Sequence, residues 1–525
     1  MVLAYPNTYR VAMSNLGFQA IRQLTDDTPG WTCDRLFLPD DAQGGRAAGQ
    51  PLRTFDNAAA PTDADLVAFS VSYELDFVNV VRLLRLLGVA ELAAERPDDD
   101  PLVALGGVMA SLNIEPIANF VDLVVVGEGE AALPGVLAAV AATRGQRKSD
   151  RLAALSALDG VYVPSLYQPV HDADGRLREI RKAPGALERV RRVIVPDLRG
   201  IDTASTVLTP NTEFADMRLV EVSRGCARGC LFCIVPTCLR PTRFRDPEHV
   251  LALGRAWHRV GLLGAAASDH PDIERIICDL ADDGREVSLS ASRSEPLTAR
   301  GLSALARAGQ RTLTLAPETG SQRLRDAIGK RMHSDDVLGT ARMAAEAGFR
   351  TIKLYFMVGL PGEDDGEPEA ILALTEEVCR AARGARVALS VNPFVPKPGT
   401  PLQWEPMADV ADLRESIARI SRGAGRLPGH PRASCEGPRW PVIEALLSRG
   451  DRRLGQVLCR VASSAGSPSD YKRALTDEAL SVGEYVHRRR DPDECFPWDT
   501  LDTGASRDHL WRRRLRMEGE ASIGR

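Results

Sequence analysis

Apolar residues recur along the first part of the chain in short runs, which helix-length segments separate. The runs are near-continuous, which is typical of strands buried on both faces of a parallel sheet. One intervening segment, residues 78–88, has apolar residues at helical spacing and ends on Gly88, as helices often do. This alternation predicts an α/β fold that begins with a doubly wound parallel sheet over residues 1–145. The predicted strands are residues 2–5, 35–38, 66–71, 102–105 and 121–126.

The same alternation recurs between residues 217 and 425, where helix-like stretches separate six apolar runs. Six strand–helix units of this length predict a partial (β/α)6 barrel, in which chemistry belongs at the carboxyl ends of the strands. We expect these strands at residues 219–222, 260–263, 287–289, 312–315, 351–357 and 387–391.

The remaining segments are a connector, residues 146–216, and a helical C-terminal region, residues 426–525. In the connector, His171 to Gly175 predicts a hairpin turn, and a metal site there is the weaker alternative. Two basic runs, residues 487–490 and 512–516, lie in the C-terminal region. They fit either a solvated helix face paired with local acids or a site for phosphate or RNA.

Composition narrows the class of protein. The net charge of -5 argues against a surface that coats nucleic acid, so we expect no nucleic-acid partner. The scattered cysteines outside residues 226–238 suit a reducing compartment. The N-terminal residues carry no signal-peptide pattern, and no apolar run is long enough to span a membrane. These features predict a cytoplasmic protein without a membrane partner.

Three thiols follow the first strand of the predicted barrel within eight residues, at Cys226, Cys230 and Cys233. This spacing can serve three corners of an iron–sulfur cubane and leave the fourth iron open to a small-molecule chelator. A structural zinc site is the alternative, but it needs a fourth ligand. Cys238 is the nearest candidate for that ligand, and Pro236 lies between it and Cys233.

The CxxxCxxC spacing, with an aromatic residue before the last cysteine, resembles the signature of radical S-adenosylmethionine (radical SAM) enzymes. The resemblance implies a [4Fe-4S] cluster held by Cys226, Cys230 and Cys233. It further implies cleavage of S-adenosylmethionine to a 5′-deoxyadenosyl radical, with electrons from an external donor such as flavodoxin or ferredoxin. In such chemistry the protein positions the reactants, tunes the cofactor and excludes water.

Residues at the ends of the barrel strands suit S-adenosylmethionine, although each is a weak signal alone. Polar side chains there can meet the ribose hydroxyls, and glycines let the chain pass close to the nucleoside. Turn glycines and a solvated or Arg-paired glutamate are the alternatives. By resemblance, the 263–268 loop meets the methionine amine and the 358–363 turn flanks the adenine. The expected cofactor-binding residues are Phe232, Gly264, Ser292, Glu318, Gly359 and Glu363.

The N-terminal sheet resembles the cobalamin-binding domain that is fused to many radical SAM enzymes. Gly106-Gly107, the following Glu-Pro pair and the run that ends in Gly127 carry this resemblance, and Ser70 and Ser72 match it loosely. It implies that these five glycines and serines bind cobalamin. No histidine precedes His171, so the first loop offers cobalt no histidine ligand. A domain that keeps the fold and has lost the cofactor is the alternative.

Taken whole, the chain resembles bacterial radical SAM proteins with a cobalamin-type domain and an unassigned substrate. The leading hypothesis is cobalamin-dependent methyl transfer to an unactivated carbon. One alternative is a cobalamin-independent radical rearrangement, oxidation or sulfur insertion. The other is a non-catalytic, cluster-containing scaffold or RNA-associated protein. No residue is assigned a catalytic role, and no loop identifies the substrate as a small molecule or a macromolecule.

Overall fold

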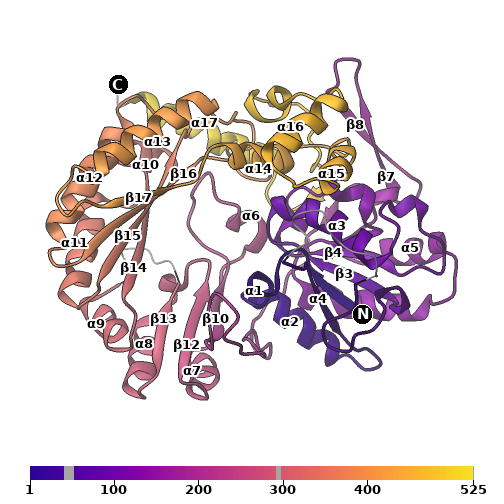
Figure 1. The fold of residues 1–525 in the computed structure, drawn as a ribbon, viewed down its shortest axis with the longest axis horizontal. Helices are drawn as coiled ribbons and strands as arrows, with labels where there is room; N and C mark the ends of the chain where they lie inside the picture. Colours follow the sequence, from indigo (N-terminus) through magenta and orange to yellow (C-terminus); the bar gives the residue numbers. More distant parts are fainter. Residues whose placement is uncertain (41–51, 291–296, 524–525) are drawn as a thin grey trace.

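The computed structural model describes residues 1–40, 52–290 and 297–523. Two lobes built on parallel strands lie side by side, and helices of the C-terminal region extend over both (Figure 1). The predicted fold class is confirmed: an α/β chain with a parallel-rich N-terminal sheet, a barrel-type second sheet system and a helical C-terminal region.

The N-terminal lobe is built on a six-stranded sheet in the order β2-β1-β3-β4-β5-β6. All neighbours are parallel except β5 and β6. All five strands expected here are present, and the short β6 lies in the segment that we assigned to the connector, so the sheet continues past residue 145. The strands are β1 (Val2–Tyr5), β2 (Asp34–Phe37), β3 (Leu66–Ser70), β4 (Leu102–Gly106), β5 (Leu123–Val125) and β6 (Val161–Tyr162).

Both faces of this sheet are buried, as its near-continuous apolar strands require. Alternate residues enter separate cores: Val67 and Phe69 pack into one, and Leu66 and Ala104 into the other. The strand order places a switch point between β1 and β3, where doubly wound sheets bind their ligands. The fold therefore opens a crevice at the carboxyl ends of these two strands.

The second lobe holds all six strands predicted for the barrel, in two hydrogen-bonded groups. The first group has the order β11-β10-β12-β13 and the second β14-β15-β16-β17. The pairs are parallel apart from β11, which runs antiparallel to β10. Two strands were not predicted, β11 (Arg243–Phe244) and β17 (Arg432–Cys435). The other strands are β10 (Arg218–Arg224), β12 (Arg259–Gly264), β13 (Glu286–Leu289), β14 (Thr312–Glu318), β15 (Thr351–Val358) and β16 (Arg386–Pro393).

Helices cover the outside of the sheets and the C-terminal region bridges the lobes. The predicted stop of α3 at Gly88 is confirmed, with that glycine at φ 71°. α15 and α16 lie over the N-terminal lobe, whereas α17 lies beside α10 on the barrel (Figure 1). The helices used below are α2 (Leu16–Asp26), α3 (Phe77–Leu87), α6 (Val235–Leu239), α9 (Ala299–Arg307), α10 (Gln322–Ala327), α12 (Glu367–Ala381), α13 (Val410–Ala424), α14 (Arg439–Arg449), α15 (Leu454–Ala462), α16 (Pro468–Asp477) and α17 (Arg507–Ile523).

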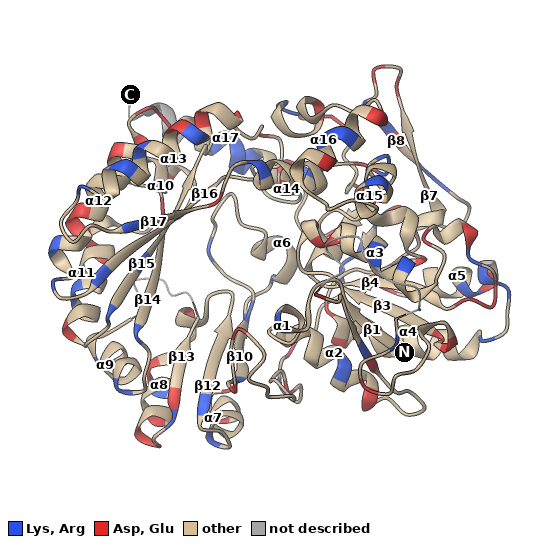
Figure 2. Ribbon diagram, viewed as in Figure 1, with Lys and Arg blue, Asp and Glu red and all other residues tan. Residues whose placement is uncertain are grey.

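The connector forms the predicted hairpin, from β7 (Tyr167–His171) and β8 (Leu177–Lys182). His171 lies 3.2 Å from Asp451, so it contacts the C-terminal region. Acidic and basic positions are interleaved along the outer helices, and α17 carries several basic ones (Figure 2). Within the described ranges, no helix is both long and apolar enough to cross a membrane. The division of the chain at residues 145, 216 and 425 stays a prediction.

Candidate functional site

The cysteine loop begins where β10 ends, at the carboxyl edge of the barrel. Gly225, directly before Cys226, has φ +86°, and a Cβ there would lie 2.4 Å from the carbonyl oxygen of Leu239. Only glycine fits this turn, because a side chain would meet backbone in a conformation that L residues rarely adopt. Cys226 and Cys233 are half-buried and Cys230 is buried. The turn thus places three thiols in a sheltered loop over the strand end.

The three thiols lie close enough to influence one another. The pKa of Cys233 is raised to about 12, chiefly by burial and to a smaller extent by the neighbouring Cys230 and Cys226. In the described part of the chain, no three His, Cys, Asp or Glu side chains converge as ligands of a single metal ion would. The ligands of a four-iron cluster each reach a different iron, so they need not converge on one point. Three thiols in one sheltered loop fit the donor set of such a cluster.

Cys238 lies apart from this set. It is buried on α6, and its thiol faces the carbonyl oxygen of Val108 at 3.9 Å, in the N-terminal lobe. The fourth zinc ligand that the sequence offered therefore points toward the other lobe.

Two elements from distant parts of the chain cover the cysteine loop. The amide of Leu231 donates to the carbonyl of Ile328 at 2.9 Å, just after α10. Gly329, at φ +70°, packs so closely that a Cβ would lie 2.7 Å from the carbonyl oxygen of Gly229. From α17, Arg513 donates to that same carbonyl, and Met517 packs in one apolar cluster with Leu231. The loop is thus held between α10 and α17.

Several of the predicted S-adenosylmethionine residues surround this loop. Phe232 packs against the apolar cluster around Leu231. Glu318, at the end of β14, forms a 2.7 Å ion pair with Lys330, whose charge acts on Cys233. Its φ of +71° is uncommon for a residue other than glycine and marks a constrained position.

Other predicted residues have clear structural partners. Glu363 accepts from the amide of Leu360 at 2.9 Å, and burial raises its pKa to about 7. A Cβ at Gly264 would lie 2.4 Å from the Ser223 hydroxyl, and one at Gly359, φ +79°, would meet Leu413. These two glycines are therefore required by packing or backbone conformation. Ser292 lies outside the described residues.

A second site, a cavity of about 500 Å³, opens at the carboxyl ends of β3, β4 and β5, and Leu3 of β1 also lines it. Its size lies in the usual range for small-molecule and cofactor sites. The structure brings all five predicted residues of the N-terminal lobe together in its wall: Ser70, Ser72, Gly106, Gly107 and Gly127. Asn15 joins them from the start of α2, donating to Ser72 at 3.0 Å. The cavity lies at the switch point that the strand order defines.

The glycines of this wall have different physical roles. A Cβ at Gly107, φ +100°, would lie 2.4 Å from the carbonyl oxygen of Val71, and one at Gly127, φ +116°, 2.1 Å from that of Val193. Both positions need glycine for the backbone itself. A Cβ at Gly106 would meet nothing within 4 Å and would enter the cavity. Gly106 therefore leaves room for a large ligand against bare backbone.

The far wall of the cavity belongs to the barrel lobe. Glu221 and Arg224 of β10, which leads into the cysteine loop, line this wall together with Cys238 of α6, which follows the loop. A ligand in this cavity would thus lie between the N-terminal sheet and the strand that carries the thiols. Among the described residues that line the cavity there is no histidine. The donor set fits a cobalamin whose cobalt takes no histidine from the protein.

Buried ion pairs join the two lobes at this wall, and they were only partly predictable from the sequence. Glu128 contacts Arg224 at 3.0 Å and Arg243 at 2.6 Å. Burial opposes ionisation of Glu128, but the two guanidinium groups lower its pKa overall. Burial likewise opposes the charge of Arg224, and Glu221 and Glu130 raise its pKa. The clue lay in the acidic loop after Gly127 and in the arginine just before Gly225, but their pairing depends on how the lobes dock.

The motif at residues 448–453 is a second joint between the lobes. Lys397, whose side chain is 14% exposed, contacts Glu74 of the N-terminal lobe and Glu444 of α14, the latter at 2.6 Å. The hydroxyl of Ser448 joins this group. Arg452 forms a 2.9 Å ion pair with Glu115 of the N-terminal lobe. The motif is therefore explained by contacts between lobes.

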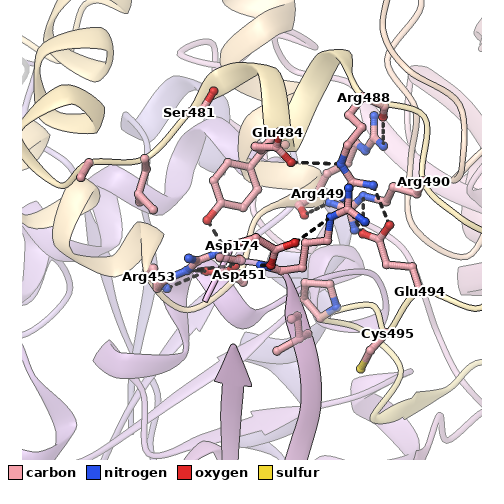
Figure 3. Close-up of a pocket in the computed structure, with 17 residues that line it drawn as sticks. Asp174, Arg449, Asp451, Arg453, Ser481, Glu484, Arg488, Arg490, Glu494 and Cys495 are labelled. Carbon is pink, nitrogen blue, oxygen red and sulfur yellow. Dashed lines mark hydrogen bonds and ion pairs between the residues drawn. The ribbon is translucent and has the colours of Figure 1, made fainter. Parts of the chain in front are cut away.

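A pocket of about 200 Å³ lies beside this joint. Figure 3 shows the guanidinium groups of Arg449, Arg488 and Arg490 gathered near Glu494. Arg449 is fully buried and donates to the carbonyls of Glu405 and Val486. Arg488 is paired with Glu494 at 2.7 Å. These arginines bind loop carbonyl groups and acidic side chains within the protein. The basic run at residues 487–490 therefore has a structural role.

Two family models match the chain. One, described as "Radical SAM proteins, N-terminal", matches residues 17–164, and the other, "Radical SAM superfamily", matches residues 220–375. The second contains the cysteine loop. The chain belongs to the radical SAM superfamily. Radical SAM proteins use a [4Fe-4S] cluster and S-adenosylmethionine, so both predicted cofactors follow from the family.

Individual proteins are similar over longer stretches. An uncharacterized protein of Methanocaldococcus jannaschii is 28% identical over 81% of this chain and 86% of its own length. A tRNA-2-methylthio-N(6)-dimethylallyladenosine synthase of Paracoccus denitrificans is 26% identical over 53% of this chain and 63% of that enzyme. The structure of the radical S-adenosylmethionine methyltransferase TsrM from Kitasatospora setae, with cobalamin and a [4Fe-4S] cluster bound, covers 99% of both chains at a TM-score of 0.50 and 13% identity. That likeness concerns the fold.

Proposed function

We propose that this radical SAM enzyme is a cobalamin-dependent methyltransferase that acts on an unactivated carbon. One observation carries the proposal: a cofactor-sized cavity lies between the carboxyl ends of the N-terminal sheet and the barrel strand that leads into the cysteine loop. Both elements line the same space. The fold shared with TsrM, whose structure contains cobalamin and a [4Fe-4S] cluster, supports the proposal.

In this proposal Cys226, Cys230 and Cys233 hold the cluster. Phe232, Gly264, Ser292, Glu318, Gly359 and Glu363 belong to the S-adenosylmethionine site. Lys330 fixes the Glu318 carboxylate by their 2.7 Å ion pair. The cover of α10 and α17 keeps water from the loop, which such radical chemistry requires.

Ser70, Ser72, Gly106, Gly107 and Gly127 form the cobalamin side of the proposal. Gly106 leaves the volume for the ring, and Asn15 fixes the Ser72 hydroxyl by a 3.0 Å hydrogen bond. When bound, the cluster supplies the electron that cleaves the sulfonium of S-adenosylmethionine, and cobalamin supplies a transferable methyl group. The Glu128–Arg224 pair fixes the separation of the two sites, because it joins the cavity wall to the last residue of β10, the strand that leads into the cysteine loop.

Anaerobic reconstitution with iron, sulfide, cobalamin and S-adenosylmethionine tests this function. We expect the visible bands of bound cobalamin, and formation of S-adenosylhomocysteine and 5′-deoxyadenosine. Cys230→Ala should lose cluster iron and both products, whereas Cys379→Ala, a half-buried cysteine on α12, should retain them. Full product formation by Cys230→Ala would contradict the cluster assignment. Cleavage of S-adenosylmethionine without cobalamin binding would favour a cobalamin-independent radical reaction.

A further inference from the structure

Five arginines from three separate segments gather on the outer side of the cysteine loop. Arg240 follows α6, Arg331 follows α10, and the other three lie on α17. All are exposed except the half-buried Arg513. We call this set the arginine patch: Arg240, Arg331, Arg512, Arg513 and Arg516.

Electrostatic neighbours define the patch as one surface. Burial lowers the pKa of Arg513. The like charges of Arg240, Arg331 and Arg516 lie close enough to lower it further. His509, one turn earlier on α17, has its pKa lowered by burial and by members of the same set. The patch also reaches the thiols: Arg513 donates to the carbonyl of Gly229 and interacts with Cys230.

In the part of the chain that the structure describes, the charges of the patch have no acidic partner within ion-pair distance. Among the described residues, none of its five arginines forms an ion pair, whereas their neighbour Arg514 pairs with Glu405 at 2.6 Å and with Glu518. The arginines of the other basic run, Arg488 and Arg490, also have acidic partners. A protein of net charge -5 thus keeps a compact group of uncompensated cations over one loop. Such repulsion is costly unless an anionic partner uses it.

We propose that the arginine patch docks a small acidic protein that donates single electrons to the cluster. The proposal rests on the superfamily assignment of the cysteine loop and is independent of cobalamin and methyl transfer. It names the surface at which the external donor binds. The electron passes from the reduced donor to the oxidised cluster, so the donor loses one electron, the cluster gains one, and no bond is formed.

The position and form of the patch favour a protein donor. Electron transfer needs the two redox centres close together, and Arg513 joins the patch directly to the backbone of the loop. Leu515, between Arg512 and Arg516 on α17, is 44% exposed and offers an apolar contact beside these charges. Electron-transfer complexes typically have small interfaces, and opposite charges steer the association of the two proteins. RNA would favour a longer basic track, and the other basic run is neutralised by its own acids.

A flavodoxin, which is acidic and carries FMN, is the probe for a binding test. Arg512→Glu/Arg516→Glu reverses two exposed charges that make no ion pair in the described structure. The matched control is Arg414→Glu/Arg422→Glu, two exposed arginines on α13 that likewise form no described ion pair. We expect the patch variant to bind flavodoxin at least ~10-fold more weakly at low salt, with a weaker salt dependence than wild type. The control should bind like wild type.

A second readout is cluster reduction by two reductants, followed by electron paramagnetic resonance. Reduction by flavodoxin should slow about tenfold in the patch variant, and reduction by dithionite should be unchanged. Unchanged flavodoxin affinity, or equal slowing with both reductants, would overturn the proposal. So would binding of tRNA that is lost in the patch variant while flavodoxin binding stays. Failure of methyl transfer with both reductants in wild type would instead refute the proposed function and leave these results interpretable.

Discussion

Replacing Glu128 by glutamine tests whether the buried ion pairs join the two lobes. Its side chain is 4% exposed and lies between Arg224 and Arg243. Glutamine keeps the shape but leaves Arg243 without a carboxylate, and removing one partner of a buried pair costs about 3–5 kcal/mol. Glu128 also lines the cavity, where water can approach, so we expect the lower end of this range. A loss of about 3 kcal/mol raises the opening equilibrium roughly a hundredfold.

The effect should depend on pH in a defined direction. The arginines lower the pKa of Glu128 in the folded protein, so its contribution is present above the unfolded pKa of about 4. It is lost as the pH falls through the lower, folded pKa. Glutamine does not titrate. The stability difference between wild type and variant should therefore be full at pH 7 and shrink below about pH 4.

Hydrogen–deuterium exchange of β1, β3 and β4 across a urea series measures this difference locally. Glu213→Gln is the matched control, because Glu213 also pairs with the N-terminal lobe, at Arg10, but is 56% exposed. That exposed pair should contribute nothing measurable. The reasoning fails if Glu128→Gln changes the opening free energy by less than about 1 kcal/mol, or equally at both pH values.

Two further substitutions test the cavity and the second joint. Gly106→Val should fold normally, since a Cβ at this position meets nothing within 4 Å. It should weaken cobalamin binding at least ~10-fold, as measured by a visible titration. The control Gly135→Val, at an exposed position on the helix after β5, should leave cobalamin binding unchanged. Equal affinity in both would contradict the assigned wall. Lys397→Met should destabilise the protein by about 3–5 kcal/mol in urea unfolding, because it leaves Glu74 buried without a cation. Adding Glu74→Gln should recover part of this loss, and no recovery would show that packing dominates.

Local patterns in the sequence predicted most of the fold. The buried strands were found because each is a near-continuous apolar run, and Gly88 marked the end of α3. β6, β11 and β17 were missed because β6 and β11 have two residues each, and β17 is four residues long with every other side chain exposed. None of the three carries a hydrophobic signal strong enough to distinguish a strand from a loop.

The candidate site was predictable only where its residues are close in sequence. The spacing of Cys226, Cys230 and Cys233 is such a case, as are the glycines of the cavity wall. The Glu128–Arg224 pair and the contact of Arg513 with Gly229 join residues far apart along the chain. Nothing in a local window records which surfaces meet when two lobes dock. For this reason the basic run of α17 was predicted from the sequence to be a solvated helix face. In the structure Arg514 is buried and Arg513 covers the cysteine loop.

The contact between α17 and the cysteine loop has a consequence for synthesis of the chain. Arg513 lies 284 residues after Gly229, so a ribosome needs roughly 15–60 s to translate the intervening segment at typical rates. Throughout that interval the nascent chain presents its three thiols without the helix that later covers them. We therefore expect iron and sulfide delivery to be easiest during translation, and slower once the finished chain has closed over the loop.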